Sequence, residues 1–363
     1  MHEIDRHTDS ATQDAMDRRS FVYQCARAGL AVGAFALLAG CRRAAPLIAP
    51  TPTGLFDPDN AKGAITYGQL AAKLGPVPRA SKSYEIGVVV KFLGNEYWKL
   101  LADGMQSRAD QYGIVLDVQG AATESDPAGQ LSIMQAMIDK GYAALLVSPQ
   151  ANENLVPAVE RARRAGILIV NVDDAVLKDA EHFVGPNQYE NGVRAAKYFV
   201  QRLPHGGEVA VIEGLAGVYA AKQRTDGFAN TLAGTNVNVV ASIHGDWDLQ
   251  KSLTAAATII RQHPDIEGFY CNNDIMALGV VEAVRDAGRL GKTMVIGTDG
   301  IHAAYDSIRA GALTGTVDSF PFVTGEAAVE VALRLLEGQA VPRVVFSPQN
   351  LVTRDNIDSP LPK

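Results

Sequence analysis

The chain has 363 residues, of which 47% are hydrophobic and 20% are charged, and this composition excludes a largely disordered protein. At roughly 100–200 residues per domain, the length predicts two domains. A formal net charge of -7 argues against a nucleic-acid-binding protein, because that class needs a basic surface to displace counterions. The three cysteines cannot form a disulfide framework, and no cysteine or histidine cluster has metal-site spacing, so neither a metal nor a cofactor is expected.

The first 40 residues have the pattern of an export signal. Arg18-Arg19 stands ahead of an uncharged apolar stretch, residues 28–40, which is shorter than the ~20 residues that a membrane-spanning helix needs. The stretch ends in Leu38-Ala39-Gly40-Cys41, which resembles the lipobox of bacterial lipoproteins. We therefore predict a twin-arginine signal peptide over residues 1–40 and lipidation of Cys41, which implies a periplasmic or other extracytoplasmic protein anchored to a membrane. The alternative is a short buried helix with an incidental cysteine.

A proline-rich segment follows the lipobox. Residues 42–83 contain six prolines among Ala, Gly, Thr and Lys, and this density disfavours helix and sheet. The segment is predicted to be an extended tether over residues 41–83, with room for one short helix near residues 67–74.

Strand and helix patterns alternate from residue 84 onward. The helix pattern is clearest where Trp98, Leu101, Met105 and Ala109 recur on one face. The apolar, β-branched runs that predict buried parallel strands are residues 86–90, 115–118, 144–147, 167–172, 209–212, 237–243, 268–271 and 294–296. Such alternation predicts an α/β fold of βαβ units, and this many strands favours two doubly wound parallel sheets.

Polar and aromatic side chains follow the predicted strands, at the edge of the sheet where ligands bind in open α/β folds. The residues that stand at these strand ends are Lys91, Asn95, Tyr97, Trp98, Asp173, Asp174, Arg224, Trp247, Asn273, Asp299 and Ser319. Asn, Asp and Arg supply the donors and acceptors that hydroxyl groups need, and aromatic rings can cover the C–H face of a sugar. This mixture favours a carbohydrate or polyol ligand.

Several of these residues have structural alternatives. Asn95, Asn273 and Asp299 also suit helix N-caps, and Trp98 also belongs to the apolar face of its helix. Cys271 is interpreted as a small buried hydrophobic residue. No Walker, GxGxxG, HExxH or GxSxG motif occurs where it would support nucleotide binding or catalysis, so no enzyme activity is predicted.

Residues 84–358 resemble the ribose-binding family of type I periplasmic substrate-binding proteins. The segments that carry the resemblance, in family order, are IGVVVKFLGNEYW, GLAGVYAAKQRTDGF, CNNDIMALGVVEAV, VIGTDG and GTVDSFP. The resemblance implies two Rossmann-like lobes joined by a three-strand hinge, with crossings near Asn187-Gln188, Ser319-Phe320 and Pro348-Gln349. The N-terminal lobe would comprise residues 84–187 and 320–348, and the C-terminal lobe residues 188–319 and 349–358.

The resemblance also implies which residues contact the sugar. The positions that match the family's contacts are Asn95, Tyr97, Trp98, Asp173, Arg224, Trp247, Asn273 and Asp299. Lys91, Asp174 and Ser319 depart from the ribose pattern. Asp174 stands where an arginine is usual, and we expect Lys91 to restore a donor by pairing with it. The lining then carries no net positive charge, which favours a neutral monosaccharide or polyol over an anionic sugar.

The leading functional hypothesis is a monomeric, lipid-anchored receptor that hands its sugar to the permease of an ABC importer. One alternative is a receptor that presents its ligand to a chemoreceptor or sensor kinase. Another is the effector domain of a LacI-type repressor, which shares the fold but would need an N-terminal helix-turn-helix where this chain has an export signal.

Overall fold

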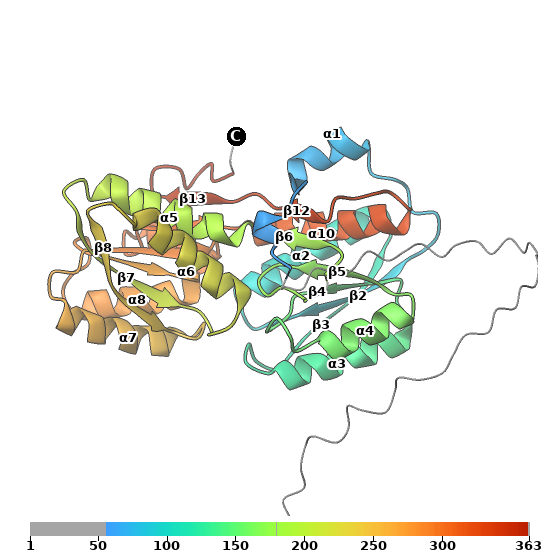
Figure 1. Ribbon diagram of the computed structural model, residues 1–363, viewed down its shortest axis with the longest axis horizontal. Helices are drawn as coiled ribbons and strands as arrows, with labels where there is room; N and C mark the ends of the chain where they lie inside the picture. The colour runs from blue at the N-terminus through green and yellow to red at the C-terminus, as the bar shows by residue number, and fades with distance from the viewer. Residues whose placement is uncertain (1–55, 179, 362–363) are drawn as a thin grey trace, which may run out of the picture. The chain divides into compact units, whose positions relative to one another are not determined.

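A computed structural model describes residues 56–178 and 180–361, which form two β-sheets with helices on both faces (Figure 1). The predicted signal peptide, Cys41 and residues 41–55 of the predicted tether lie outside the described residues. No helix within residues 56–178 and 180–361 is both long enough and apolar enough to cross a membrane.

Sheet A has seven strands, all parallel, in the order β1-β12-β6-β5-β4-β2-β3. Helices α2 and α10 lie on one face and α3 and α4 on the other (Figure 1). We call sheet A and these four helices the sheet A half. Its elements are β1 (Ile65–Thr66), β2 (Glu85–Val90), α2 (Glu96–Tyr112), β3 (Val115–Gly120), α3 (Pro127–Lys140), β4 (Ala144–Val147), α4 (Val156–Arg164), β5 (Leu168–Val172), β6 (Phe183–Gly185), α10 (Pro321–Leu336) and β12 (Val344–Phe346).

Sheet B has six strands in the order β13-β11-β10-β9-β7-β8, with α5 and α6 on one face and α7 and α8 on the other (Figure 1). We call this sheet and helices α5 to α9 the sheet B half. Its elements are α5 (Gln188–Arg202), β7 (Gly207–Glu213), α6 (Tyr219–Leu232), β8 (Val237–His244), α7 (Leu249–Gln262), β9 (Gly268–Cys271), α8 (Asp274–Asp286), β10 (Met294–Asp299), α9 (His302–Arg309), β11 (Gly315–Asp318) and β13 (Asn350–Thr353).

The α/β prediction is confirmed, with one correction to sheet B. Strand β13 runs antiparallel to β11, so sheet B is mixed rather than purely parallel. The strand is the last of the chain and reaches the sheet edge directly from β12, without a crossover helix. Because β13 enters from β12 of sheet A and not through a βαβ unit of sheet B, the rule that crossover connections give parallel neighbours does not apply to it.

The chain passes between the two halves three times. It leaves the sheet A half between β6 and α5, returns between β11 and α10, and leaves again between β12 and β13. These passages lie at residues 186–187, 319–320 and 347–349. Whether each half moves as a rigid lobe, as the predicted boundaries imply, stays a prediction.

The strands form where the sequence has continuous apolar runs, because both faces of each sheet are covered. Val88 and Val89 are adjacent in β2 and point to opposite faces, yet both are fully buried. The predicted apolar face of α2 is also confirmed, since Leu101, Met105 and Ala109 are completely buried.

Two helix pairs pack at unusually close range through reciprocal glycines. A Cβ atom on Gly192 of α5 would lie 2.0 Å from the carbonyl oxygen of Arg224, and one on Gly227 of α6 would lie 2.1 Å from that of Tyr189. Gly104 and Gly325 make the same arrangement between α2 and α10. Each half therefore contains a helix pair whose backbones touch at reciprocal positions where only glycine fits.

The prediction of an extended tether is wrong for residues 56–66, whereas the short helix expected near residues 67–74 is confirmed. Residues 56–74 contain a 3-10 turn at Pro58–Asn60, strand β1, a second 3-10 turn at Tyr67–Gln69 and helix α1 (Leu70–Leu74). Strand β1 extends sheet A beside β12, and Leu70 is buried. Pro58 occupies the first position of its turn, where the missing N–H costs no hydrogen bond. Proline density alone therefore did not indicate a solvated chain.

Candidate functional site

A small cavity of about 20 Å³ lies where the strand ends of both halves meet. Its lining residues from the sheet A half are Lys91, Asn95, Tyr97, Trp98, Glu124 and Asp174, and those from the sheet B half are Arg224, Trp247, Asn273 and Asp299. The structure thus brings together nearly all residues predicted for the ligand site. The exceptions are Asp173, which lies behind the lining, and Ser319.

Lys91 follows β2 and is almost completely buried. Its ammonium group donates to the carboxylate of Asp174, which is the pairing predicted from the sequence. The Nζ atom also lies 5.5 Å from the ring centre of Trp98 and 5.7 Å from that of Trp247. Burial lowers the pKa of Lys91 to about 8, against the attraction of nearby carboxylates such as Glu124.

Asp173 and Asp174 end strand β5 in a strained backbone. Their φ angles are 53° and 55°, in the left-handed region that ordinary residues avoid. This bend turns Asp174 toward Lys91 and leaves Asp173 buried, where it accepts from the hydroxyl of Tyr97 and from Nε2 of Gln188 at 2.6 Å. Burial raises the pKa of Asp173, although Arg224 and these donors oppose the shift.

Arg224 projects from α6 and is held at several points. Its Nε donates to Oε1 of Gln188 at 2.8 Å, and its Nη1 donates to the carbonyl oxygen of Asn272 at 2.5 Å. The same Nη1 lies 3.7 Å from Oδ1 of Asp299. These contacts fix the plane of the guanidinium group, which is a prerequisite for directed, bidentate hydrogen bonding.

Asp299 closes β10 with a φ of 143°, which is also unusual for a residue with a side chain. Burial raises the pKa of its carboxyl group well above the usual value, despite the opposing charge of Arg224.

Trp247 lies in the turn between β8 and α7. Asp246 and Trp247 have φ angles of 52° and 63°, so the ring is placed by a strained backbone, as Asp173 and Asp174 are. Among the described residues, the buried indole Nε1 of Trp247 has no hydrogen-bond partner. Buried donors are rarely left unpaired, so this N–H is available to a ligand.

Asn95 and Asn273 are both helix caps and cavity-lining residues, the two roles between which the sequence analysis did not decide. Each caps a helix, because Asn95 accepts from the amide of Tyr97 at 3.0 Å and Asn273 from that of Met276 at 2.9 Å. Each also lines the cavity. Asp299 lines the cavity but caps no helix, since α9 begins after Ile301.

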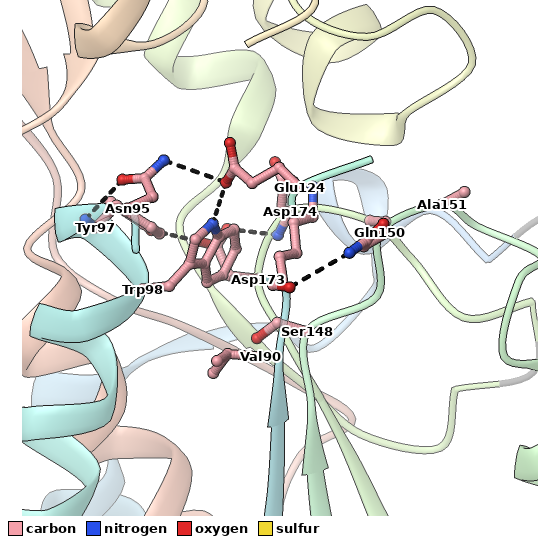
Figure 2. A network of polar contacts seen from close by, with 12 residues as sticks. Val90, Asn95, Tyr97, Trp98, Glu124, Ser148, Gln150, Ala151, Asp173 and Asp174 are labelled. Carbon is pink, nitrogen blue, oxygen red and sulfur yellow. Dashed lines mark hydrogen bonds and ion pairs between the residues drawn. The ribbon is translucent and has the colours of Figure 1, made fainter. Parts of the chain in front are cut away.

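Glu124 is the lining residue that the sequence analysis did not identify. Figure 2 shows its carboxylate between Asn95 and Trp98, and its Oε1 accepts from Nδ2 of Asn95 and Nε1 of Trp98. Glu124 lies in the loop after β3, a strand end for which no candidate was named. The strand-end rule would have found it had it been applied there.

Ser319 lies in the second passage between the halves and away from the cavity lining. Its hydroxyl is 3.3 Å from Nδ2 of Asn191, whose Oδ1 accepts from Nε2 of Gln349 at 2.8 Å. Gln349 also accepts from the amide of Asn187. Polar side chains therefore join all three passages, and Ser319 contributes to this joint. Its role as a ligand contact stays a prediction.

One further contact joins the halves at the protein surface. Glu96 begins α2, and its Oε1 lies 3.1 Å from the backbone N and 2.5 Å from Nδ1 of His302, the first residue of α9. Among the described residues, no group of histidine, cysteine, aspartate and glutamate side chains could hold a metal ion.

Comparison with known proteins agrees with this geometry. The periplasmic binding protein domain matches residues 86–340. The chain belongs to the periplasmic binding protein family. A D-ribose/D-allose-binding protein of Pseudomonas aeruginosa is 34% identical over 74% of this chain and 88% of its own length. A D-allose-binding periplasmic protein of Escherichia coli is 35% identical over 68% of this chain and 83% of its own length.

Solved structures show the same fold. A periplasmic solute-binding protein of an ABC transporter from Actinobacillus succinogenes, with bound D-allose, has a TM-score of 0.72 and 31% identity and covers 76% of this chain and 99% of its own. A solute-binding protein from Mycobacterium smegmatis with bound glycerol has a TM-score of 0.72 and 29% identity and covers 78% of this chain and 98% of its own. The family resemblance deduced from the sequence is thus confirmed, and the relatives named here are binding proteins.

Proposed function

We propose that the chain is a solute-binding protein that holds one neutral monosaccharide or polyol in the cavity and delivers it to an ABC-type importer. The observation that carries the proposal is the lining itself. The rings of Trp98 and Trp247 approach the same ammonium group from opposite halves, and fixed polar groups surround them. Ring faces suit the C–H surface of a sugar, and directed donors and acceptors suit its hydroxyl groups.

The charge of the lining favours a neutral ligand. Two cationic groups, Lys91 and Arg224, face three carboxyl groups, those of Glu124, Asp174 and Asp299. Both cations already have partners, since Lys91 donates to Asp174 and Arg224 lies beside Asp299. A phosphate or carboxylate in this cavity would find no cation without a carboxyl neighbour.

The relatives support this ligand class. Their names and bound molecules include D-ribose, D-allose and glycerol, all of them neutral polyhydroxyl compounds. Periplasmic relatives also support an extracytoplasmic location and a partner permease. Both walls of the cavity come from one chain, so a monomer would carry the complete site.

Thermal unfolding and calorimetry with a ligand series test the proposal. The series would contain D-ribose, D-allose, myo-inositol and glycerol, with D-ribose 5-phosphate as the anionic counterpart. A neutral member present at 100 times its Kd should stabilise the protein by about 2.7 kcal/mol, which raises the unfolding temperature by several degrees. Stabilisation by the phosphate alone, or by no member of the series, would contradict the proposed ligand class.

A matched pair of arginine variants assigns the binding to this cavity. Arg224→Ala should weaken binding by about 2–5 kcal/mol, because it removes one partner of buried, charged hydrogen bonds. Arg285→Ala removes an arginine that pairs with Glu282 on the surface of α8 and should leave the affinity unchanged. Equal affinities of the two variants would place the ligand elsewhere.

We also propose that Cys41 carries the lipid anchor and that the protein leaves the cytoplasm by the twin-arginine route. The support is the order of the Arg18-Arg19 pair, the short apolar stretch and the lipobox in the sequence. Cys41→Ala should release the protein from the membrane fraction or block removal of the signal. An unchanged membrane fraction and unchanged mobility would contradict the anchor.

A further inference from the structure

Residues 56–74, which we call the strap, lie outside the region matched to the family and contact both halves. On the sheet A half, β1 pairs with β12, and the hydroxyl of Tyr67 donates to Glu330 at 2.9 Å. On the sheet B half, Asp57 accepts from the hydroxyl of Tyr219 at 2.6 Å. The strap therefore spans the joint between the halves.

Asp59 connects the strap to the start of α5. Its two carboxylate oxygens accept from the backbone amides of Gln188 at 3.1 Å and Tyr189 at 3.0 Å. These amides have no partner within the helix, so a residue about 130 positions earlier in the chain satisfies them. A carboxylate at a helix N-terminus is also favoured by the helix dipole.

The first residue of that helix connects in turn to the cavity. The buried side chain of Gln188 donates through Nε2 to Asp173 at 2.6 Å and accepts through Oε1 from Arg224 at 2.8 Å. Asp173 ends β5 of the sheet A half, and Arg224 belongs to α6 of the sheet B half. The side chain of Gln188 thus hydrogen-bonds to Asp173 of one half and Arg224 of the other, while its backbone amide donates to the strap.

We propose that Asp59 is a positioning residue for the ligand site, which acts through Gln188 to orient Asp173 and Arg224, so that the N-terminal strap and the cavity are energetically coupled. The inference rests on the proposed function only in taking Arg224 as a ligand contact. Cys41, the proposed site of the lipid anchor, precedes the strap by few residues in the sequence. The coupling would therefore link ligand occupancy of the cavity to the segment of the chain that follows the anchor.

The first test needs no ligand. Hydrogen exchange of the unliganded full-length protein would be compared with that of Asp59→Ala and Asp59→Asn at pH 8, where Asp59 of the wild type is ionised because burial raises its pKa only to about 7. We expect faster exchange in the first turn of α5, and also in the turn that follows β5 and contains Asp173. Faster exchange confined to the strap and α5 would overturn the proposal.

The second test is a double-mutant cycle on affinity, measured with D-ribose and D-allose. Asp59→Ala should raise Kd by at most about thirtyfold, the limit reached if the whole free energy of a lost helix cap were coupled to binding. In a Gln188→Ala background, the same substitution should leave Kd nearly unchanged, because the connection is already broken. Tyr67→Phe, which loosens the strap only from the sheet A half, is the control and should leave Kd unchanged in both backgrounds.

The outcomes separate the two proposals. An equal rise in Kd with and without Gln188 would show that Asp59 does not act through Gln188, and an unchanged Kd in both backgrounds would show that Asp59 only stabilises the fold. Either result would overturn the proposal. If the wild type bound neither sugar, the proposed ligand class would be contradicted, while the exchange at the β5 turn would still decide whether the strap and the cavity are coupled.

Discussion

At the scale of single residues, Glu124 affects the protonation of Lys91 without a hydrogen bond to it among the described contacts. Its carboxylate accepts from Asn95 and Trp98, and it is the largest of the influences that keep the pKa of Lys91 from falling further. The ion pair of Lys91 and Asp174 therefore depends on the negative charge of Glu124.

This dependence predicts a shifted pH profile for Glu124→Gln. In the wild type, Lys91 loses its proton as the pH rises through about 8, which leaves Asp174 buried without a cation. Removing the Glu124 charge lowers the pKa of Lys91 further, so sugar affinity should begin to fall at a lower pH than in the wild type. Calorimetric titrations between pH 6 and pH 9 would measure the midpoint.

Asp139→Asn provides the control for this experiment, because it removes an exposed carboxylate that pairs with Arg161 on the surface of the sheet A half. Its affinity profile should coincide with that of the wild type. A Glu124→Gln midpoint equal to or above the wild-type midpoint would contradict the assigned electrostatics.

The sequence predicted which residues line the cavity where these directly follow a long strand. The pairing of Lys91 with Asp174 was predicted from the resemblance, because these two departures from the ribose pattern compensate each other in charge. Gln188 and Asp59 were not predicted, since their importance lies in contacts between segments far apart in the chain. Ser319 was placed at the site by resemblance, but the structure shows that its position belongs to the joint between the halves.

At the scale of elements, the close contact of α5 and α6 links fold stability to the site. Gln188 begins α5 and Arg224 lies one turn before Gly227 of α6, so the spacing of the two helices sets the distance between these side chains. The two helices approach each other at Gly192 and Gly227, where an added methyl group would clash with backbone atoms of the other helix.

Gly227→Ala should therefore lower both stability and affinity. The added methyl would lie 2.1 Å from the carbonyl oxygen of Tyr189, and overpacking of this kind costs about 1–3 kcal/mol. Denaturant unfolding and sugar titration would measure the two effects. Gly68→Ala, at a position with open space around it, should change neither. A stable Gly227→Ala variant with normal affinity would show that the helix spacing is not constrained.

The long buried strands of both sheets were predictable because each has a continuous apolar run between helices of clear periodicity. Strands β1, β6, β12 and β13 were not, because two to four residues carry no periodic signal. The segment 56–74 was also misjudged as an extended tether, because its single proline stands at a turn while Ile65 and Leu70 are buried in the core. Composition averaged over a segment conceals such isolated anchoring residues.

At the scale of the whole molecule, the contact between Glu96 and His302 joins the two halves at the protein surface. Receptors of this architecture close around a ligand by hinge rotation, and a contact between the halves stabilises only the closed state. His302→Ala should therefore increase the dissociation rate of a bound sugar. The pair is exposed, so we expect an effect of about two- to fivefold.

Stopped-flow release of D-allose or D-ribose would measure this rate. His263→Ala is the matched control, because His263 pairs with Glu208 within the sheet B half and should leave release unchanged. Small-angle scattering with and without sugar gives the complementary measurement. An unchanged radius of gyration at saturation, together with an unchanged release rate, would contradict a closing receptor.

The placement of the aromatic side chains has an optical consequence. The sequence contains two tryptophans, Trp98 and Trp247, and both line the cavity, one from each half. All tryptophan emission of the protein therefore originates at the cavity walls, with no background from elsewhere in the chain. A bound molecule that displaces water from the indoles should shift this emission to shorter wavelength, and Trp98→Phe and Trp247→Phe would separate the signals of the two walls. The protein thus contains its own fluorescent reporter of occupancy, which requires no label.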